Sequence, residues 1–288
     1  MMPNSNGHRR VLPKTGDRLT LGRSGLKVSP VCLGLTADPD TVLAAYEEGV
    51  NFFFVTGDLH WPLYDGVRKG LAKLLRGNEA RRQEIVVGVV SYLDNPLFSA
   101  LQFDEVISEV PGLKYVDLIV AGAVSSTQSF YSRLDSLTRA RAGSQHGAKA
   151  IGATFHQRSL ALIADYYDLL DISYIRYNSA HPGARTDLFP YFRPNRTTPV
   201  FNFKSTMSRV SEQAFTQLKL PNAKWLPETC DYYRFVLSRS EIDGILCSPF
   251  QPAEMRQLAR ALDKPPLTND EEEYMIWLSS LTHAAVLA

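Results

Sequence analysis

The stretch Ile85-Val-Val-Gly-Val-Val90 is an unbroken apolar run of the length of one β-strand. A segment with helical periodicity, Phe103–Val110, follows it, and a second apolar run, Val116–Ala121, comes next. Parallel strands that are buried on both faces have this continuous apolar character, and a helix usually connects one to the next. The stretch therefore predicts a β–α–β unit in a parallel sheet.

The same alternation repeats along most of the chain, with helical segments between most of the apolar runs. The predicted strands are Val31–Leu35, Asn51–Val55, Ile85–Val90, Val116–Ala121, Ala148–Ala153, Asp171–Tyr177, Pro199–Phe203 and Asp243–Cys247. About eight such units predict an α/β protein with a closed (β/α)8 TIM barrel, a fold that needs about 250 residues. The chain has 288 residues, so one barrel fits. Active sites of this fold lie at the C-terminal ends of the strands.

Three further segments surround the predicted barrel. Residues 1–17 are polar and predict a disordered N-terminal arm, which leaves residues 18–288 as a single domain. The turn at Arg23-Ser-Gly25 lies between two short apolar runs and predicts a β-hairpin that closes the bottom of the barrel. Near the C-terminus, Thr268 or Asn269 can cap an added helix that packs on the barrel.

Composition excludes several classes of function. The 31 Lys and Arg residues balance 30 Asp and Glu residues, which argues against non-specific nucleic-acid binding. No apolar run approaches the roughly 20 residues of a membrane span, and the N-terminus lacks the apolar core of a secretory signal. The odd number of cysteines predicts reduced thiols in a cytoplasmic protein, and the six histidines lack the spacing of metal ligands.

Several motifs, in this order and spacing, resemble the aldo-keto reductase superfamily from about residue 18 to the C-terminal helix. They are Leu21-Gly-Arg-Ser-Gly-Leu-Lys-Val-Ser29, Ala45-Tyr-Glu-Glu-Gly-Val-Asn-Phe-Phe53, Arg82-Gln-Glu-Ile-Val-Val87, Tyr115-Val-Asp-Leu118, Ile151-Gly-Ala-Thr154 and Arg176-Tyr-Asn-Ser-Ala-His-Pro-Gly-Ala184. The resemblance implies a (β/α)8 barrel that reduces carbonyl groups with NADPH. In that family a tyrosine donates the proton, a lysine paired with an aspartate lowers the pKa of the tyrosine, and a histidine orients the carbonyl.

The four family positions hold other residues in this sequence. The aspartate corresponds to Val55, if one additional phenylalanine is allowed before it, and the tyrosine to His60. The lysine corresponds to Val90 and the histidine to Gly122. Replacing both members of a buried ion pair by apolar residues avoids leaving one charge uncompensated. We therefore interpret Val55 and Val90 together as a catalytic site that has lost its charged residues.

The resemblance also indicates where the nicotinamide ring of NADP would lie. The serine and asparagine that end the fifth strand correspond to Thr154 and Phe155, so the hydroxyl is kept and the amide is not. The glutamine of the sixth strand corresponds to Tyr174. The aromatic residue that stacks on nicotinamide corresponds to Phe203.

The phosphate end of the cofactor site keeps more of the family pattern. The stretch Ser248-Pro-Phe-Gln-Pro-Ala-Glu-Met-Arg-Gln257 resembles the phosphate-binding loop and the helix after it. A helix N-terminus favours phosphate, and Arg256 or Lys204 can add positive charge. We expect no cofactor, and NADP is the alternative. The residues that would hold it are Thr154, Phe203, Lys204, Ser248 and Arg256.

Two classes of function follow. The first is a binding or accessory protein, a pseudoenzyme of a biosynthetic or metabolic pathway that holds a small-molecule or peptide ligand for a partner enzyme. The alternative is an active NADP-dependent oxidoreductase, or a cofactor-free lyase or isomerase, with a site rebuilt around His60 and Asp58. His156 and Arg176, which also fall near predicted strand ends, support the alternative. A structural or oligomer-forming subunit is a third hypothesis.

Overall fold

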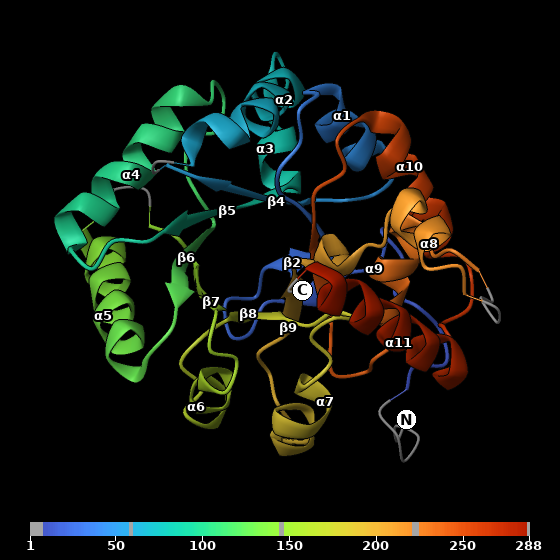
Figure 1. Ribbon diagram of the computed structural model, residues 1–288. Coiled ribbons are helices and arrows are strands. Elements are labelled where there is room, and N and C mark those ends of the chain that lie inside the picture. The colour runs from blue at the N-terminus through green and yellow to red at the C-terminus, as the bar shows by residue number, and fades with distance from the viewer. Residues whose placement is uncertain (1–7, 58–59, 144–146, 221–224, 287–288) are drawn as a thin grey trace.

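Eight parallel strands close into a barrel in the order β10-β3-β4-β5-β6-β7-β8-β9 (Figure 1). The computed structural model describes residues 8–57, 60–143, 147–220 and 225–286. The barrel strands are β3 (Val31–Leu33), β4 (Phe52–Thr56), β5 (Val86–Ser91), β6 (Leu118–Val124), β7 (Ala150–Phe155), β8 (Ile172–Arg176), β9 (Val200–Phe203) and β10 (Gly244–Cys247). The predicted (β/α)8 barrel is confirmed.

Helices surround the strands, as Figure 1 shows. The α-helices are α1 (Asp40–Glu47), α2 (Asp65–Leu75), α3 (Arg81–Glu84), α4 (Pro96–Glu109), α5 (Thr127–Gly143), α6 (Leu160–Tyr166), α7 (Ala184–Asp187), α8 (Glu212–Gln217), α9 (Thr229–Leu237), α10 (Pro252–Ala261) and α11 (Asn269–Val286). Three short 3₁₀ helices are η1 (Trp61–Tyr64), η2 (Phe189–Tyr191) and η3 (Ser205–Ser208). None of the helices within the described ranges is both long enough and apolar enough to cross a membrane.

A two-stranded hairpin closes the N-terminal end of the barrel. Strands β1 (Leu19–Thr20) and β2 (Lys27–Val28) pair in antiparallel register. Leu21 and Val28 are both fully buried, and they pack with the side chains that point into the barrel. The hairpin therefore plugs the bottom of the barrel, as predicted from its turn.

Aromatic rings fill the inside of the barrel. The ring centroids of Phe52 and Phe201 lie 5.7 Å apart, and those of Phe201 and Tyr174 lie 5.8 Å apart, both edge to face. Phe54 meets Tyr174 in the same way at 5.6 Å. Because aromatic side chains bury large apolar areas, this chain of contacts makes the interior a packed core.

The N-terminal segment is ordered where it is described. Leu12 is 2% exposed and packs into the core between sheet and helices. The main-chain N–H of Arg9 donates to the carbonyl of Ser238 at 2.7 Å, and His8 forms a β-bridge with Arg239. The prediction of a disordered arm over residues 1–17 is therefore wrong for residues 8–17, because apolar burial and main-chain hydrogen bonds hold this segment. Residues 1–7 lie outside the described residues.

Helix α11 begins with the predicted cap. The hydroxyl of Thr268 accepts a hydrogen bond from the main-chain N–H of Glu271 at 3.2 Å, and the Glu271 carboxylate accepts one from the N–H of Thr268 at 2.7 Å. These reciprocal bonds form a capping box. Further along the helix, the hydroxyls of Ser279 and Ser179 lie 2.6 Å apart. This contact fastens α11 to the loop that follows β8.

Two motifs of the family resemblance meet in one buried ion pair. Arg82 donates to the carboxylate of Asp117 at 2.7 Å, and the two side chains are 2% and 6% exposed. The guanidinium also donates to the carbonyls of Ile85 and Tyr115, and Asp117 accepts from the N–H of Val87. Burial raises the pKa of Asp117, and the charge of Arg82 opposes this. The pair ties the start of β5 to the segment that leads into β6.

Substituting Arg82→Met is expected to lower the free energy of unfolding by about 3–5 kcal/mol, because it leaves the Asp117 carboxylate buried without a counter-charge. Urea denaturation at neutral pH measures this change. The matched control is Arg139→Met, since Arg139 forms an exposed pair with Asp135 that is expected to contribute less than about 1 kcal/mol. Equal effects of the two substitutions would contradict the structural role of the buried pair.

Candidate functional site

The C-terminal ends of the strands form the mouth of the barrel, and its floor is apolar. Val90 is fully buried and points into the barrel, beside Phe54 and Tyr174. Tyr64 of η1 and Tyr92, which follows β5, pack against the same inner cluster. The floor of the mouth is therefore made of aliphatic and aromatic side chains.

The structure corrects the position assigned to the family's aspartate. Val55 packs with the residues between the sheet and the helices, whereas its neighbour Phe54 belongs to the inner cluster. Successive side chains of a strand point to opposite faces, so Thr56 lies on the inner side with Phe54. The Thr56 hydroxyl donates to the carbonyl of Val90 at 3.4 Å. Val55 and Val90 are therefore not two halves of one replaced ion pair.

A tyrosine ring occupies the space next to the position matched to the family's histidine. A Cβ atom added to Gly122 would lie only 2.5 Å from ring atoms of Tyr92. The ring of His60 lies 5.3 Å from that of Tyr92, and His60 is exposed. Tyr92 was not among the predicted site residues, although its position two residues after the predicted strand Ile85–Val90 was the available signal. Asp58 lies outside the described residues.

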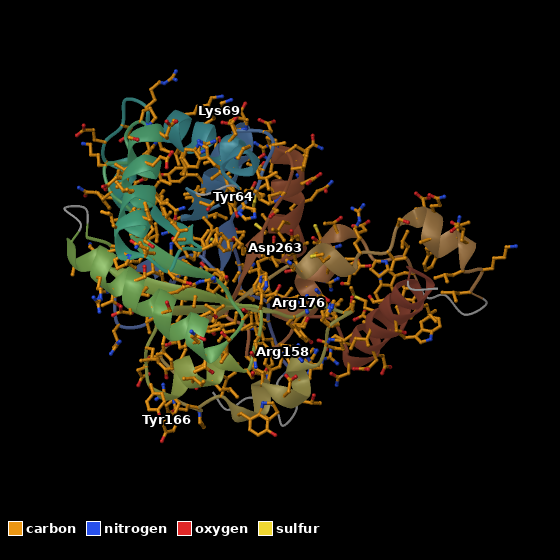
Figure 2. The ribbon with its side chains drawn as sticks, turned by 60° about the vertical axis from the view of Figure 1, so that its left-hand side comes forward. Tyr64, Lys69, Arg158, Tyr166, Arg176 and Asp263 are labelled. Carbon is orange, nitrogen blue, oxygen red and sulfur yellow. The ribbon has the colours of Figure 1, made fainter. Side chains whose placement is uncertain are left out.

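A histidine and two positively charged side chains follow three neighbouring strands. His156 comes directly after β7, Arg176 ends β8, and Lys204 comes directly after β9. Figure 2 labels Arg176 near the middle of the molecule. Among the described residues, neither the guanidinium of Arg176 nor the ammonium of Lys204 has a hydrogen bond or an ion pair. This side of the mouth therefore carries uncompensated positive charge.

The positive charge on this side of the mouth affects the pKa of His156. Its ring stacks on Phe203, with centroids 6.0 Å apart and an interplanar angle of 22°. Partial burial lowers the pKa of His156, and the charges of Lys204, Arg176 and Arg133 lower it further. Neighbouring cations disfavour the protonated ring. The three side chains after β7, β8 and β9 therefore act on one another electrostatically.

The residues at the mouth do not fit a nicotinamide ring. The hydroxyl of Thr154 accepts a hydrogen bond from the main-chain N–H of Ala123 at 2.7 Å. Tyr174 is fully buried within the aromatic interior, and His156 already stacks on Phe203. The carboxamide of nicotinamide needs side-chain amides, and the matched strand ends supply none.

Charged contacts within the protein surround the phosphate end of the matched site. Arg256, which was expected to offer charge to a phosphate, forms an exposed ion pair with Glu47 of α1 at 3.3 Å. The N–H of Ser248 approaches the hydroxyl of Tyr233 at 3.4 Å. At the start of α10, the Glu254 carboxylate accepts a hydrogen bond from the N–H of Phe250 at 2.7 Å. This carboxylate adds negative charge beside the start of α10, which disfavours a phosphate there.

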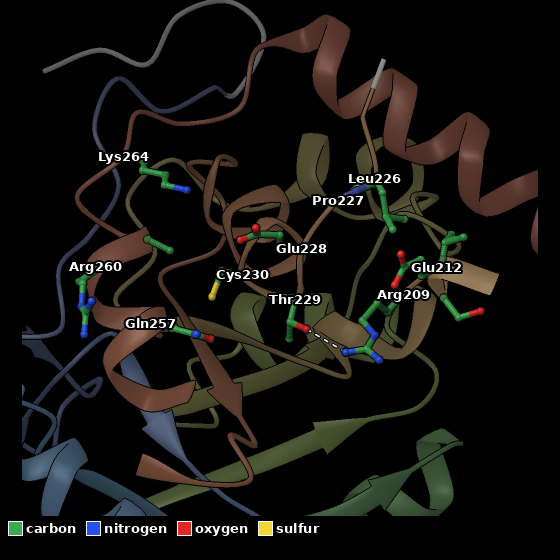
Figure 3. A pocket seen from close by; sticks show the side chains of 13 residues that line it. Arg209, Glu212, Leu226, Pro227, Glu228, Thr229, Cys230, Gln257, Arg260 and Lys264 are labelled. Carbon is green, nitrogen blue, oxygen red and sulfur yellow. Dashed lines mark hydrogen bonds between the residues drawn. The ribbon is translucent and has the colours of Figure 1, made fainter. Parts of the chain in front are cut away.

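Two clefts lie beside α10, away from the floor of the mouth. One, of about 460 Å³, is lined by Ser248, Phe250 and Glu254 among others. The other, of about 540 Å³, carries charges of both signs, and Figure 3 shows Arg209 donating to the hydroxyl of Thr229 within it. Burial raises the pKa of Cys230, which borders both clefts, to about 11. This thiol therefore stays protonated at neutral pH and is a poor nucleophile.

Comparison with solved structures identifies the same barrel in other proteins. An aldo-keto reductase of Bacillus halodurans matches in its holo form with a TM-score of 0.67 and 13% identity, over 91% of this chain and 96% of that chain. Its apo form matches with a TM-score of 0.65 and 13% identity, over 91% of this chain and 95% of that chain. A Pseudomonas aeruginosa protein described as an aldo-keto reductase matches with a TM-score of 0.61 and 16% identity, over 88% of this chain and 98% of that chain.

No family profile and no curated protein sequence matches the chain. At 13–16% identity the likeness to the solved structures concerns the fold. The chain thus has the barrel architecture of aldo-keto reductases.

Proposed function

We propose that this chain is a ligand-binding barrel of aldo-keto reductase descent that does not reduce carbonyl groups with NADPH. The observation that carries the proposal is the Tyr92 ring beside Gly122, the position matched to the carbonyl-orienting histidine. A histidine side chain has no room there unless Tyr92 moves. The carbonyl would therefore lack the group that orients it.

The surroundings of Val90 support the same conclusion. A lysine at this position would enter a fully buried apolar cluster beside Phe54 and Tyr174. Burying an ammonium group there without a counter-charge is strongly unfavourable. Without a lysine at this position, the family's means of lowering the pKa of the proton-donating tyrosine is missing. Losing a positioned general acid costs about 10²–10⁴-fold in rate.

A binding role fits the groups that remain. The mouth combines an apolar floor with the cations Arg176 and Lys204, which form no ion pair with the residues that the structure describes. Binding sites for small molecules typically join apolar walls to a few polar groups that fix orientation. We place a small-molecule ligand at this mouth, held for a partner enzyme of a metabolic pathway. The described thiols of Cys32, Cys230 and Cys247 are free, which fits the cytoplasm.

One observation favours a second candidate function. The rings of His60 and Tyr92 are neighbours at the mouth, with centroids 5.3 Å apart. An imidazole and a phenol in such proximity can exchange protons with a bound carbonyl compound. This pair would suit a cofactor-free lyase or isomerase, with His60 as the acid–base residue.

Titrating the protein with NADPH is expected to give no saturable change in nucleotide or tryptophan fluorescence. The physical reason is that the matched strand ends supply no side-chain amide, that His156 stacks on Phe203, and that the Glu254 carboxylate adds negative charge beside the start of α10. The same samples, mixed with a panel of aldehydes and ketones, are expected to show no oxidation of NADPH at 340 nm. Saturable binding together with turnover of any panel member would overturn the proposed function.

The second candidate is tested without a cofactor. In heavy water, a lyase or isomerase of this kind exchanges protons on the carbon next to a carbonyl group, and proton NMR detects the loss of signal. The proposed binding role predicts no exchange above background for a panel of 2-oxo acids. Exchange by the unmodified protein that disappears in His60→Ala, and persists in Lys149→Gln at the opposite end of the barrel, would instead establish the second candidate.

The packing of Tyr92 on Gly122 is tested by a double-mutant cycle. Gly122→Ala is expected to lower the free energy of unfolding by about 1–3 kcal/mol, because the new methyl group collides with the ring. In a Tyr92→Ala background the same substitution is expected to cost nothing. The control is Gly147→Ala, since no heavy atom lies within 4 Å of its added Cβ. A cost at Gly122 that persists without the Tyr92 ring would show that the ring does not fill this space.

A further inference from the structure

We infer that the mouth binds an oxyanion, the carboxylate or phosphate group of a small molecule, through Arg176, Lys204 and His156. This ligand class deepens the proposed binding role and depends on it. The three side chains lie on the wall of the mouth formed by β7, β8 and β9. The family resemblance assigns the reacting groups to β4, β5 and β6, and it places the nicotinamide contacts Thr154, Tyr174 and Phe203 on this wall.

The strand register brings the three groups together. In the barrel, Phe155 of β7 pairs with Ile175 of β8, and Arg176 of β8 pairs with Phe203 of β9. His156 and Lys204 follow Phe155 and Phe203 directly, so the three side chains start from the same level of adjacent strands. Neighbouring strands lie about 4.8 Å apart, which places the three groups within reach of one small anion.

Other cations on the same rim form ion pairs, whereas Arg176 and Lys204 form none with the described residues. Arg158, two residues after His156, forms a two-fold contact with the carboxylate of Asp187. Arg133 of α5 donates to Asp94 at 2.9 Å. Arg176 is only partly exposed, yet no carboxylate of the described residues approaches it. A guanidinium that is partly removed from water and has no partner in the protein gains charge-assisted hydrogen bonds when an anion binds.

The charges also repel one another in the free protein. His156 feels the positive charges of Lys204, Arg176 and Arg133, and the last of these is paired with Asp94. An anion bound between them would remove this repulsion and accept hydrogen bonds from the planar guanidinium fork. The stacked rings of Phe203 and His156 border the same place and offer an apolar surface to the rest of the ligand.

Isothermal titration calorimetry with benzoate and phenyl phosphate tests the inference. Saturable binding of at least one probe is expected, and Arg176→Gln is expected to weaken it at least about tenfold, because a charge-assisted hydrogen bond is lost. Arg176→Lys keeps the charge and is expected to restore part of the affinity. The matched control is Lys149→Gln, which removes one positive charge at the start of β7, the opposite end of the same strand; it is expected to leave the affinity unchanged.

The titration of His156, followed by proton NMR, gives a second readout. Without a probe, its pKa is expected below that of an ordinary histidine. Bound benzoate is expected to raise this pKa, because a nearby negative charge favours the protonated ring. By linkage, benzoate binds more tightly as the pH falls through the pKa of His156. The Arg176→Gln variant is expected to lose the response to benzoate.

The outcomes separate this inference from the proposed function. Equal affinity of the unmodified protein and Arg176→Gln would mean an adventitious ion only, and would overturn the inference. Failure of both probes to bind would overturn it as well. Neither result touches the loss of reductase chemistry, which the NADPH titration tests by itself. Binding of only one probe would support the inference and identify the ligand as a carboxylate or as a phosphate.

Discussion

The edge-to-face contact of Phe54 with Tyr174 determines what the rest of the barrel can do. These residues come from β4 and β8, which lie on opposite sides of the eight-stranded ring, and their centroids are 5.6 Å apart. With Phe52 and Phe201 they fill the interior by aromatic packing. Any chemistry must therefore use side chains above this floor, from the last residue of each strand or the loop after it. Tyr92, His156, Arg176 and Lys204 occupy those positions.

Much of the fold could be predicted, because the apolar runs of a parallel barrel are continuous and the motifs fix its framework. Arg82 and Asp117 belong to two of those motifs, and they form a buried ion pair. The resemblance thus persists in residues that hold strands together, while residues at the strand ends differ. The predicted hairpin and the capped C-terminal helix are present for equally local reasons, a short turn and a capping box.

Two kinds of feature could not be predicted: which side chains of a strand point into the barrel, and which residues distant in the sequence contact one another. Because three successive phenylalanines precede Val55, the sequence does not reveal which side chains of β4 point into the barrel. An alignment error of one residue then assigns each side chain to the wrong face of the strand. Arg256 pairs with Glu47, 209 residues away in the chain, so no local pattern indicated its partner. A single leucine, Leu12, anchors an otherwise polar N-terminal segment. The net charge of +1 gave no sign of the cations at the mouth, because ion pairs elsewhere balance the total, whereas Arg176 and Lys204 form none with the described part of the chain.

We propose that the barrel mouth is suited to an anion and not to a reduced nicotinamide. A crystal structure of the protein grown with both NADPH and phenyl phosphate would test this proposal. We expect phosphate oxygens within hydrogen-bonding distance of the Arg176 guanidinium, with the Phe54–Tyr174 contact unchanged below. A nicotinamide ring stacked on Phe203, with His156 displaced from it, would overturn the proposal.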